Sequence, residues 1–266
     1  MNERINGLTK IILFPHTGIS LENITIQNND ADVALATKVE VGIKILPLIK
    51  REWIIERVSL DSPTFFIIKD KNGRFNFETL KRRAGAFALG NVSIKGGDLL
   101  YRDETSGVRN ELHKCDLAIQ TFSVGTGNVL SAISFDGNLS CGEARVRKLR
   151  ISNITAVMKG QGGKFEANPF TVKIFGGTGE GKITLAMTDD RPEYVVDFAI
   201  TRLRFEEMLE TFKERKSING ALDMKTHLVM AGRSTEEMTR TAQGDISLRG
   251  QNLSCRLRHR PCAGKV

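Results

Sequence analysis

The two-residue alternation of the segment from Val33 to Ile45 is the feature that most constrains the fold. Apart from one threonine, its odd-numbered positions are apolar, whereas its even-numbered positions hold lysine, glutamate, alanine and glycine. Successive side chains of a β-strand point to opposite faces, so this pattern predicts a strand with one apolar and one solvated face. The same alternation returns around residues 133–139, 170–174, 183–187, 194–200, 222–230 and 246–248.

Short runs of Gly, Asn or Asp separate many of the predicted strands, which indicates hairpin turns between antiparallel neighbours. Examples are Asp136-Gly137, Gly176-Gly177 and Asn219-Gly220. Helical patterns are few. The spacing predicts short helices over Phe77–Arg83 and Phe205–Lys216, and Ser234 with Glu237 forms a capping box that opens a third. These helices cover only part of so long a sheet.

A dozen one-sided strands must shield their apolar face from water. A two-layer sandwich would do so, as would a trough that stays open to acyl chains or to a partner, while a sheet closed on itself is less natural with interrupting helices. A glycine followed by a short alternating strand recurs at Gly137, Gly181, Gly220 and Gly244, and such repetition favours elongated stacking. The expected fold class is mostly β: a long antiparallel meander curled into an open groove, with a few short helices.

The strand phases also predict which side chains line this groove. Residues of one phase share one sheet face, and Lys38, Glu40, Lys44, Lys173 and Asp197 fall in the opposite, solvated phase. The expected groove residues are Val39, Val41, Ile43, Ile45, Phe170, Val172, Ile174, Tyr194, Val196 and Phe198.

The sequence carries no motif for catalysis, a metal or a cofactor. The glycine-rich stretch from Gly177 to Gly181 precedes an alternating strand and not a helix, so it reads as a hairpin rather than a phosphate loop. Cys255, His259 and Cys262 lack the fourth ligand of a typical metal site and are read as part of a basic tail. We therefore expect a protein that is not an enzyme, with no catalytic residues and no cofactor.

The formal charge of +8 is spread over a surface of interleaved Lys, Arg and acids. The densest basic cluster, Arg145, Arg147, Lys148 and Arg150, alternates along a strand and has no helix or aromatic platform beside it, so nucleic acid is not an expected partner. The four cysteines are scattered, which indicates a fold that does not depend on disulfides. No run approaches the about 20 apolar residues of a membrane-spanning helix, and the start resembles no signal peptide.

Several segments together resemble the AsmA family of bacterial envelope proteins. They occur in the family's order: Leu13-Phe14-Pro15 with the following Ile-Ser-Leu21, Val39 to Leu48, Ile54 to Pro63, Lys71-Asn-Gly73-Arg-Phe-Asn76-Phe, Val92 to Asp103 with its Gly-Gly-Asp98, and Phe175-Gly-Gly177-Thr-Gly-Glu-Gly. The resemblance extends from about Leu13 to Gly250. It predicts an N-terminal lead over residues 1–12, an AsmA-like β-groove domain over 13–250 and a basic, disordered tail over 251–266.

The resemblance implies a periplasmic protein associated with the inner membrane that acts in outer-membrane biogenesis. The family is related to bridge-like lipid-transfer proteins, in which a curled sheet forms an apolar groove for phospholipid tails. The expected partners are therefore phospholipid or another acyl lipid, a membrane, and possible envelope proteins. The alternative is a structural or protein-interaction β-sandwich that carries no lipid.

Overall fold

The structure is a computed structural model, and it describes residues 3–5, 9–12, 17–28, 31–44, 47, 54–77, 87–125, 132–187, 191–212, 217–257 and 260–261. Strands dominate it, as the sequence predicts. The strands are β1 (Glu3–Ile5), β2 (Thr9–Ile12), β3 (Gly18–Asn28), β4 (Ala31–Ile43), β5 (Ile55–Asp61), β6 (Thr64–Lys69), β7 (Phe87–Leu89), β8 (Asn91–Asp103), β9 (Arg109–Val124), β10 (Ile133–Val146), β11 (Leu149–Gln161), β12 (Lys164–Ile174), β13 (Gly177–Met187), β14 (Pro192–Arg204), β15 (Ser217–Ala231), β16 (Gln243–Leu257) and β17 (Arg260–Pro261). The helices are α3 (Phe205–Thr211) and α4 (Thr235–Thr241).

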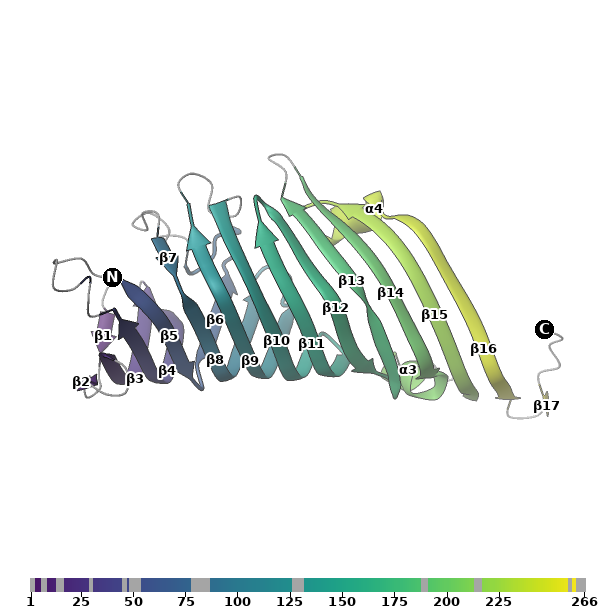
Figure 1. Cartoon of the computed structure of the whole chain (residues 1–266). Coiled ribbons are helices and arrows are strands. Elements are labelled where there is room, and N and C mark those ends of the chain that lie inside the picture. The colour runs from purple at the N-terminus through teal and green to yellow at the C-terminus, as the bar shows by residue number, and fades with distance from the viewer. Residues whose placement is uncertain are drawn as a thin grey trace.

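All of these strands belong to one sheet. Figure 1 shows them side by side along the length of the molecule, and the sheet curls so that a fainter wall lies behind the front one. From β8 to β16 each strand pairs antiparallel with the next one in the chain. The predicted mostly β, antiparallel meander with few helices is confirmed.

One pairing departs from the meander, because β5 and β6 both run parallel to β8. A parallel pair needs a connection that carries the chain back to the starting edge, and the stretch after β6 begins this return. Asn76 fixes its start: its amide accepts from the Ile68 N–H and donates to the Phe66 carbonyl at 2.8 Å, while its own carbonyl accepts from Asn28. The return thus begins from a turn that bonds to β6 and to the end of β3.

Two of the three predicted helices lie in the described chain. In α4 the Ser234 hydroxyl accepts a hydrogen bond from the Glu237 N–H at 3.2 Å, which is the capping interaction the sequence predicts. In α3 an ion pair of 2.9 Å joins Arg204 to Glu207 in the first turn. The predicted helix over residues 77–83 falls almost entirely outside the described residues.

A line of kinks crosses the sheet and bends its strands. Asn23, Lys114, Asn153 and Arg202 each adopt a left-handed backbone conformation inside a strand, with φ between +48° and +55°. Gly96 does the same in β8 with φ of +59°. Such single residues insert a bulge, which bends the strand and moves every later side chain to the other face. The kinks therefore give the sheet its curl, and they break the sequence alternation into short runs.

Aspartate side chains from neighbouring strands hold three of these kinks. Asp116 accepts a hydrogen bond from the Gly96 N–H at 2.8 Å, and Asp98 accepts one from the Lys114 N–H at 3.0 Å, so β8 and β9 hold each other reciprocally. Asp223 of β15 accepts from the Arg202 N–H at 2.8 Å in the same way. Each carboxylate satisfies a backbone donor that the bulge has removed from the ladder.

Two sequence predictions are wrong at positions where the phase of a strand changes. In β4 the phase changes at Thr37: Ala34 pairs with Phe65 and Ala36 with Ile24 on the apolar side, so Val33 and Leu35 lie on the opposite face from Val39. The tail predicted over 251–266 is a strand as far as Leu257, because a left-handed Asn252 with φ of +50° shifts the phase and hides the alternation. At the other end β2 lies within the predicted lead and pairs with β3.

We predict that Asp223→Ala lowers the free energy of unfolding by about 1–2 kcal/mol, because the Arg202 N–H loses its acceptor. Asp223→Asn keeps an acceptor oxygen and should recover most of that loss. Asp245→Ala is the matched control, since Asp245 is exposed and forms no hydrogen bond or ion pair with the described residues. Urea unfolding followed by circular dichroism measures all three. Equal stability of the Asp223→Ala and Asp245→Ala variants would contradict the proposed role of Asp223.

Candidate functional site

The apolar side chains of the sheet line up in rows that cross it from strand to strand. Cross-strand partners share a face, so the register of each strand pair shows which residues lie beside one another. One row runs through Leu21, Val39, Leu60, Ile94, Leu117, Leu139, Ala156, Phe170, Gly181, Phe198, Thr226 and Ile246. A second runs through Ile19, Val41, Val58, Val92, Ile119, Gly137, Met158, Ala167, Ile183, Val196, Leu228 and Gly244.

We call the surface formed by these rows and their same-phase neighbours the apolar face. Neighbouring strands lie about 4.8 Å apart, so a row that crosses twelve strands is about 50 Å long. Every residue of both rows is apolar or glycine, with the single exception of Thr226. The apolar face is therefore a continuous strip along the molecule and not a local patch.

No second layer packs on the apolar face among the described residues, whose strand packing is lateral along the one sheet. Its central side chains are nevertheless buried: Val172 is 5% exposed and Ile154 6%, whereas Val157 on the other face of β11 is 38% exposed. Side chains crowd together on the inside of a bend and spread apart on its outside. The burial therefore places the apolar face on the concave side of the curled sheet.

Glycines in β13 make room for aromatic rings on the apolar face. Gly179 and Gly181 both lie against Phe198, and a Cβ at Gly179 would stand 2.5 Å from that ring. Across Gly181 the rings of Phe198 and Phe170 lie 5.9 Å apart. The prediction that Gly177 to Gly181 forms a hairpin is wrong in position, because the turn is at Phe175-Gly176 and these glycines lie within β13.

A disulfide lies at the centre of the apolar face. Cys115 of β9 and Cys141 of β10 are direct cross-strand partners and are joined, with a Cα–Cα distance of 4.0 Å. Cys141 is 2% exposed and packs with Ala144, Ile154 and Val172 in the buried cluster. The sequence predicts a fold that does not depend on disulfides, and the structure contains this one. Each cysteine stands in the apolar phase of its strand, but only the register of the β9–β10 pair makes them partners.

The opposite face of the sheet is polar and charged. Lys38 pairs with Glu40 at 2.6 Å and Lys182 with Glu166 at 2.9 Å, both on this face. The hydrogen bond from Lys182 lowers the pKa of Glu166, so this carboxylate stays ionised at neutral pH. A hydrogen bond joins the Asp197 carboxylate to the His227 ring on the neighbouring strand. The predicted solvated phase of the strands is therefore a surface of short ion pairs.

A shallow depression of about 550 Å³ also lies on the polar face. Its side-chain lining comes from the phase opposite to Leu117 and Leu139, with the small residues Ala118, Asn138 and Ser140 at its centre. Its lining comes from strands β8 to β12 alone, whereas the rows described above cross twelve strands. The apolar face is thus the larger feature, and it forms the candidate site.

The structure gathers nine of the ten predicted groove residues on the apolar face. Val39, Val41, Phe170, Val196 and Phe198 belong to the two rows. The phase of β4 adds Ile43, that of β12 adds Val172 and Ile174, and that of β14 adds Tyr194. Ile45 lies outside the described residues. The predicted groove residues do not include the middle of the face, Ile94, Leu117, Leu139 and Ala156, and kinks at Gly96, Lys114 and Asn153 interrupt the alternation of β8, β9 and β11.

The described residues hold no group of three His, Cys, Asp or Glu side chains that could bind a metal ion. Of the weak metal candidate, His259 and Cys262 lie outside those residues. Within the described part of the chain, no helix is sufficiently long and apolar to cross a membrane.

A single kinked sheet with one continuous apolar face defines a β-groove protein. The profile of the AsmA family matches residues 95–252, which are more than half of the chain. The chain belongs to the AsmA family, and this membership fits a general role in biogenesis of the bacterial envelope. No curated protein sequence matches it.

We predict that the double variant Cys115→Ala/Cys141→Ala has a free energy of unfolding lower by about 2–4 kcal/mol, because the disulfide restricts the unfolded chain. Urea unfolding measures the difference, with Cys255→Ala as the control. Dithiothreitol should lower the midpoint of the unsubstituted chain and leave that of the double variant unchanged. Titration of four free thiols in the oxidised, denatured chain would contradict the disulfide.

Proposed function

We propose that this chain holds or transfers lipid acyl chains along its apolar face and that it acts in outer-membrane assembly or phospholipid transport. The observation that carries the proposal is the continuity of the apolar rows across twelve strands, on which no described residue forms a second layer. Exposed apolar surface of this extent marks a binding surface in most proteins.

The dimensions of the face suit acyl chains. The hydrocarbon core of a bilayer is about 30 Å thick, so one acyl chain spans about 15 Å. A row of about 50 Å accommodates several chains end to end. Each methylene group taken out of water contributes about 0.8 kcal/mol, and the uniform apolar lining offers this gain anywhere along the row. Such a surface binds hydrocarbon without selecting one position for it.

The location proposed for the chain is the periplasm, in association with the inner membrane. The disulfide between Cys115 and Cys141 supports an oxidising compartment, since disulfides persist there and are rare in the cytosol. Family membership supports an envelope location. The partners we propose are phospholipid or another acyl lipid, a membrane surface, and possible envelope proteins. Nucleic acid is not among them.

We further propose that the chain performs no catalysis and needs no cofactor. The motifs for a nucleophile, a metal site or a nucleotide loop are missing from the sequence, and the glycine-rich stretch that most resembled a phosphate loop lies in strand β13. Its glycines serve packing against Phe198. Lipid would be moved by binding alone.

The alternative function is a structural or protein-interaction β-sandwich without lipid. A sandwich fills its core with a second sheet, whereas the described strands belong to one sheet. The apolar side chains at the β16 end, with Ile246 59% and Leu248 60% exposed, are open to a protein partner as well as to lipid. A test must therefore separate a filled core from a lipid-bearing face.

Two adjacent valines of β14 provide that test, because Val196 lies on the apolar face and Val195 on the opposite one. We predict that Val196→Glu remains folded and carries at least about tenfold less lipid, since a carboxylate costs about 2–3 kcal/mol among hydrocarbon. Val195→Glu should keep its lipid. The measurement is mass spectrometry of lipids that co-purify with each variant, with circular dichroism to establish folding.

The sandwich would be favoured if Val196→Glu unfolds, Val195→Glu stays folded and the unsubstituted chain carries no lipid. That result would show that Val196 lies in a packed core. Equal lipid contents of the two variants would place the lipid elsewhere on the molecule.

A further inference from the structure

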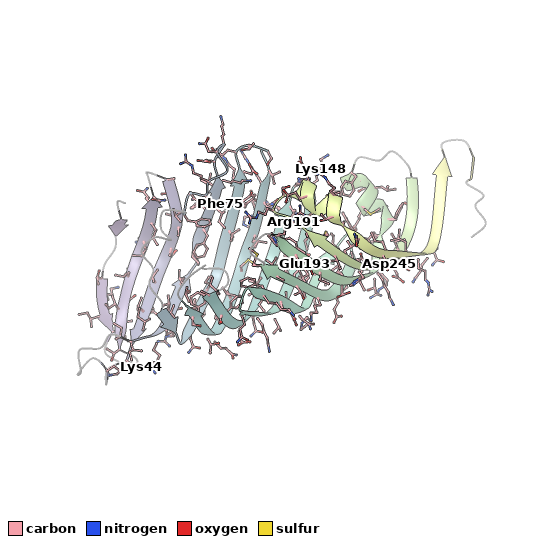
Figure 2. The ribbon with its side chains drawn as sticks, turned by 90° about the horizontal axis from the view of Figure 1, so that it is seen from above. Lys44, Phe75, Lys148, Arg191, Glu193 and Asp245 are labelled. Carbon is pink, nitrogen blue, oxygen red and sulfur yellow. A yellow bond between two sulfur atoms is a disulfide. The ribbon has the colours of Figure 1, made fainter. Side chains whose placement is uncertain are left out.

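One edge of the sheet, where consecutive hairpins turn, is rich in cations. The turns that join β8 to β9, β10 to β11 and β12 to β13 all lie on this edge, because the strands between them run side by side. Lys148, labelled in Figure 2, belongs to the middle one of these turns. We call this edge the basic rim, and its cations include Arg109, Arg145, Arg147, Lys148, Arg150 and Lys173.

The carboxylates of the basic rim are less exposed than its guanidinium groups. Glu143 is 27% exposed, whereas its ion-pair partners Arg145 and Arg150 are 51% and 70% exposed. The hydrogen bond from Arg145 is the main cause that lowers the pKa of Glu143, so this carboxylate stays ionised near neutral pH. Arg145 and Arg150 thus share the half-buried Glu143, and Arg145 also pairs with Glu111 at 3.6 Å, while both guanidinium groups stay more than half exposed.

Further cations at this rim form no ion pair with the described residues. Arg147 and Lys148 form the exposed β10–β11 turn, and neither makes an ion pair with any described residue. Lys173 is also exposed and unpaired within the described chain. The excess positive charge is therefore concentrated at the tip of one hairpin and beside it.

Among the described residues of β11 to β13, the opposite edge of the sheet lacks this excess. There Lys159 has Asp136 at 3.9 Å and Lys182 has Glu166 at 2.9 Å. The β11–β12 turn on this edge consists of Gln161, two glycines and Lys164, and it carries a single cation. The two edges thus differ in charge although the apolar face between them is continuous.

The β10–β11 hairpin also joins the basic rim directly to the apolar face. Val146 and Leu149 pair with each other and lie in the apolar phase, where Val146 also pairs with Asn110. Arg147 and Lys148 follow immediately beyond them. A lipid whose acyl chain lies on this wall would place its polar end at the two cations.

We infer that the basic rim binds the phosphate groups of anionic phospholipids whose acyl chains lie on the apolar face. This inference rests on the proposed lipid-carrying function and adds a headgroup class to it. Guanidinium and ammonium groups donate charge-assisted hydrogen bonds to phosphate oxygens. A zwitterionic headgroup contains a positive charge of its own beside the phosphate. Its electrostatic attraction to the cations of the rim is therefore weaker. The chain should therefore favour anionic over zwitterionic phospholipid.

The test compares two variants with the same change in charge. Arg147→Glu/Lys148→Glu reverses the two positive charges of the β10–β11 turn. Lys159→Glu/Lys164→Glu reverses the charges of two lysines at the opposite edge. The whole chain and both variants are incubated with vesicles of equal parts phosphatidylglycerol and phosphatidylcholine and then separated from them. Mass spectrometry gives the amount of each lipid carried per protein, and thermal unfolding checks that each variant is folded.

We expect the unsubstituted chain and the Lys159/Lys164 variant to carry phosphatidylglycerol in roughly tenfold excess, as a small cluster of cations near an anionic headgroup allows. The Arg147/Lys148 variant should carry both lipids about equally, with its phosphatidylcholine load unchanged. Inorganic phosphate at constant ionic strength should not remove the preference, since free phosphate lacks the acyl chains.

The outcomes separate this inference from the function on which it rests. Equal uptake of the two lipids by the unsubstituted chain would contradict headgroup binding by the basic rim. The proposal that the chain carries lipid would stand. Equal loss of preference in both variants would show that overall charge, and not the rim, makes the selection. Competition by inorganic phosphate would indicate a site for free phosphate. A chain that takes up neither lipid would overturn the proposed function and this inference together.

Discussion

The kinks inside the strands are the constraint on which the rest of the structure depends. A flat sheet of this length would expose its whole apolar side to water. The left-handed residues at Gly96, Lys114 and Asn153 bend neighbouring strands at adjoining positions, so the bend continues from strand to strand. A left-handed conformation costs about 1 kcal/mol or more in a residue other than glycine. Asparagine reduces this cost, and aspartate acceptors offset it at Lys114 and Arg202.

Burial without a second layer follows from that bend. Val172 and Ile154 lose nearly all contact with water although only residues of their own sheet surround them. The bend brings neighbouring strands' side chains together near the disulfide, and glycines of β13 admit the Phe198 ring. Away from this centre, toward β16, the same phase becomes exposed at Ile246 and Leu248. The sheet thus has a packed centre within an otherwise open apolar strip.

The alternation of the sequence was sufficient to predict the fold class and most of the apolar face. It succeeded where a strand stays in one phase for several residues, as from Val39 to Ile43 and from Tyr194 to Phe198. It failed at the kinks, since one inserted residue exchanges the two faces, and this is why Val33 and Leu35 were assigned to the wrong side. The disulfide between Cys115 and Cys141 depends on the β9–β10 register, which residue spacing does not specify.

Transfer of a lipid requires a surface that binds it everywhere with similar strength, because one deep site would hold the cargo in place. Each strand adds one residue to every apolar row, so the length of the face grows with the number of strands. A depression of about 550 Å³ lies on the polar face instead, among Ala118, Asn138 and Ser140. If lipid moves along the apolar rows, the steps in its path are the strand spacings of about 4.8 Å. Each step then exchanges one set of apolar neighbours for an equivalent set, which keeps the barriers between positions low.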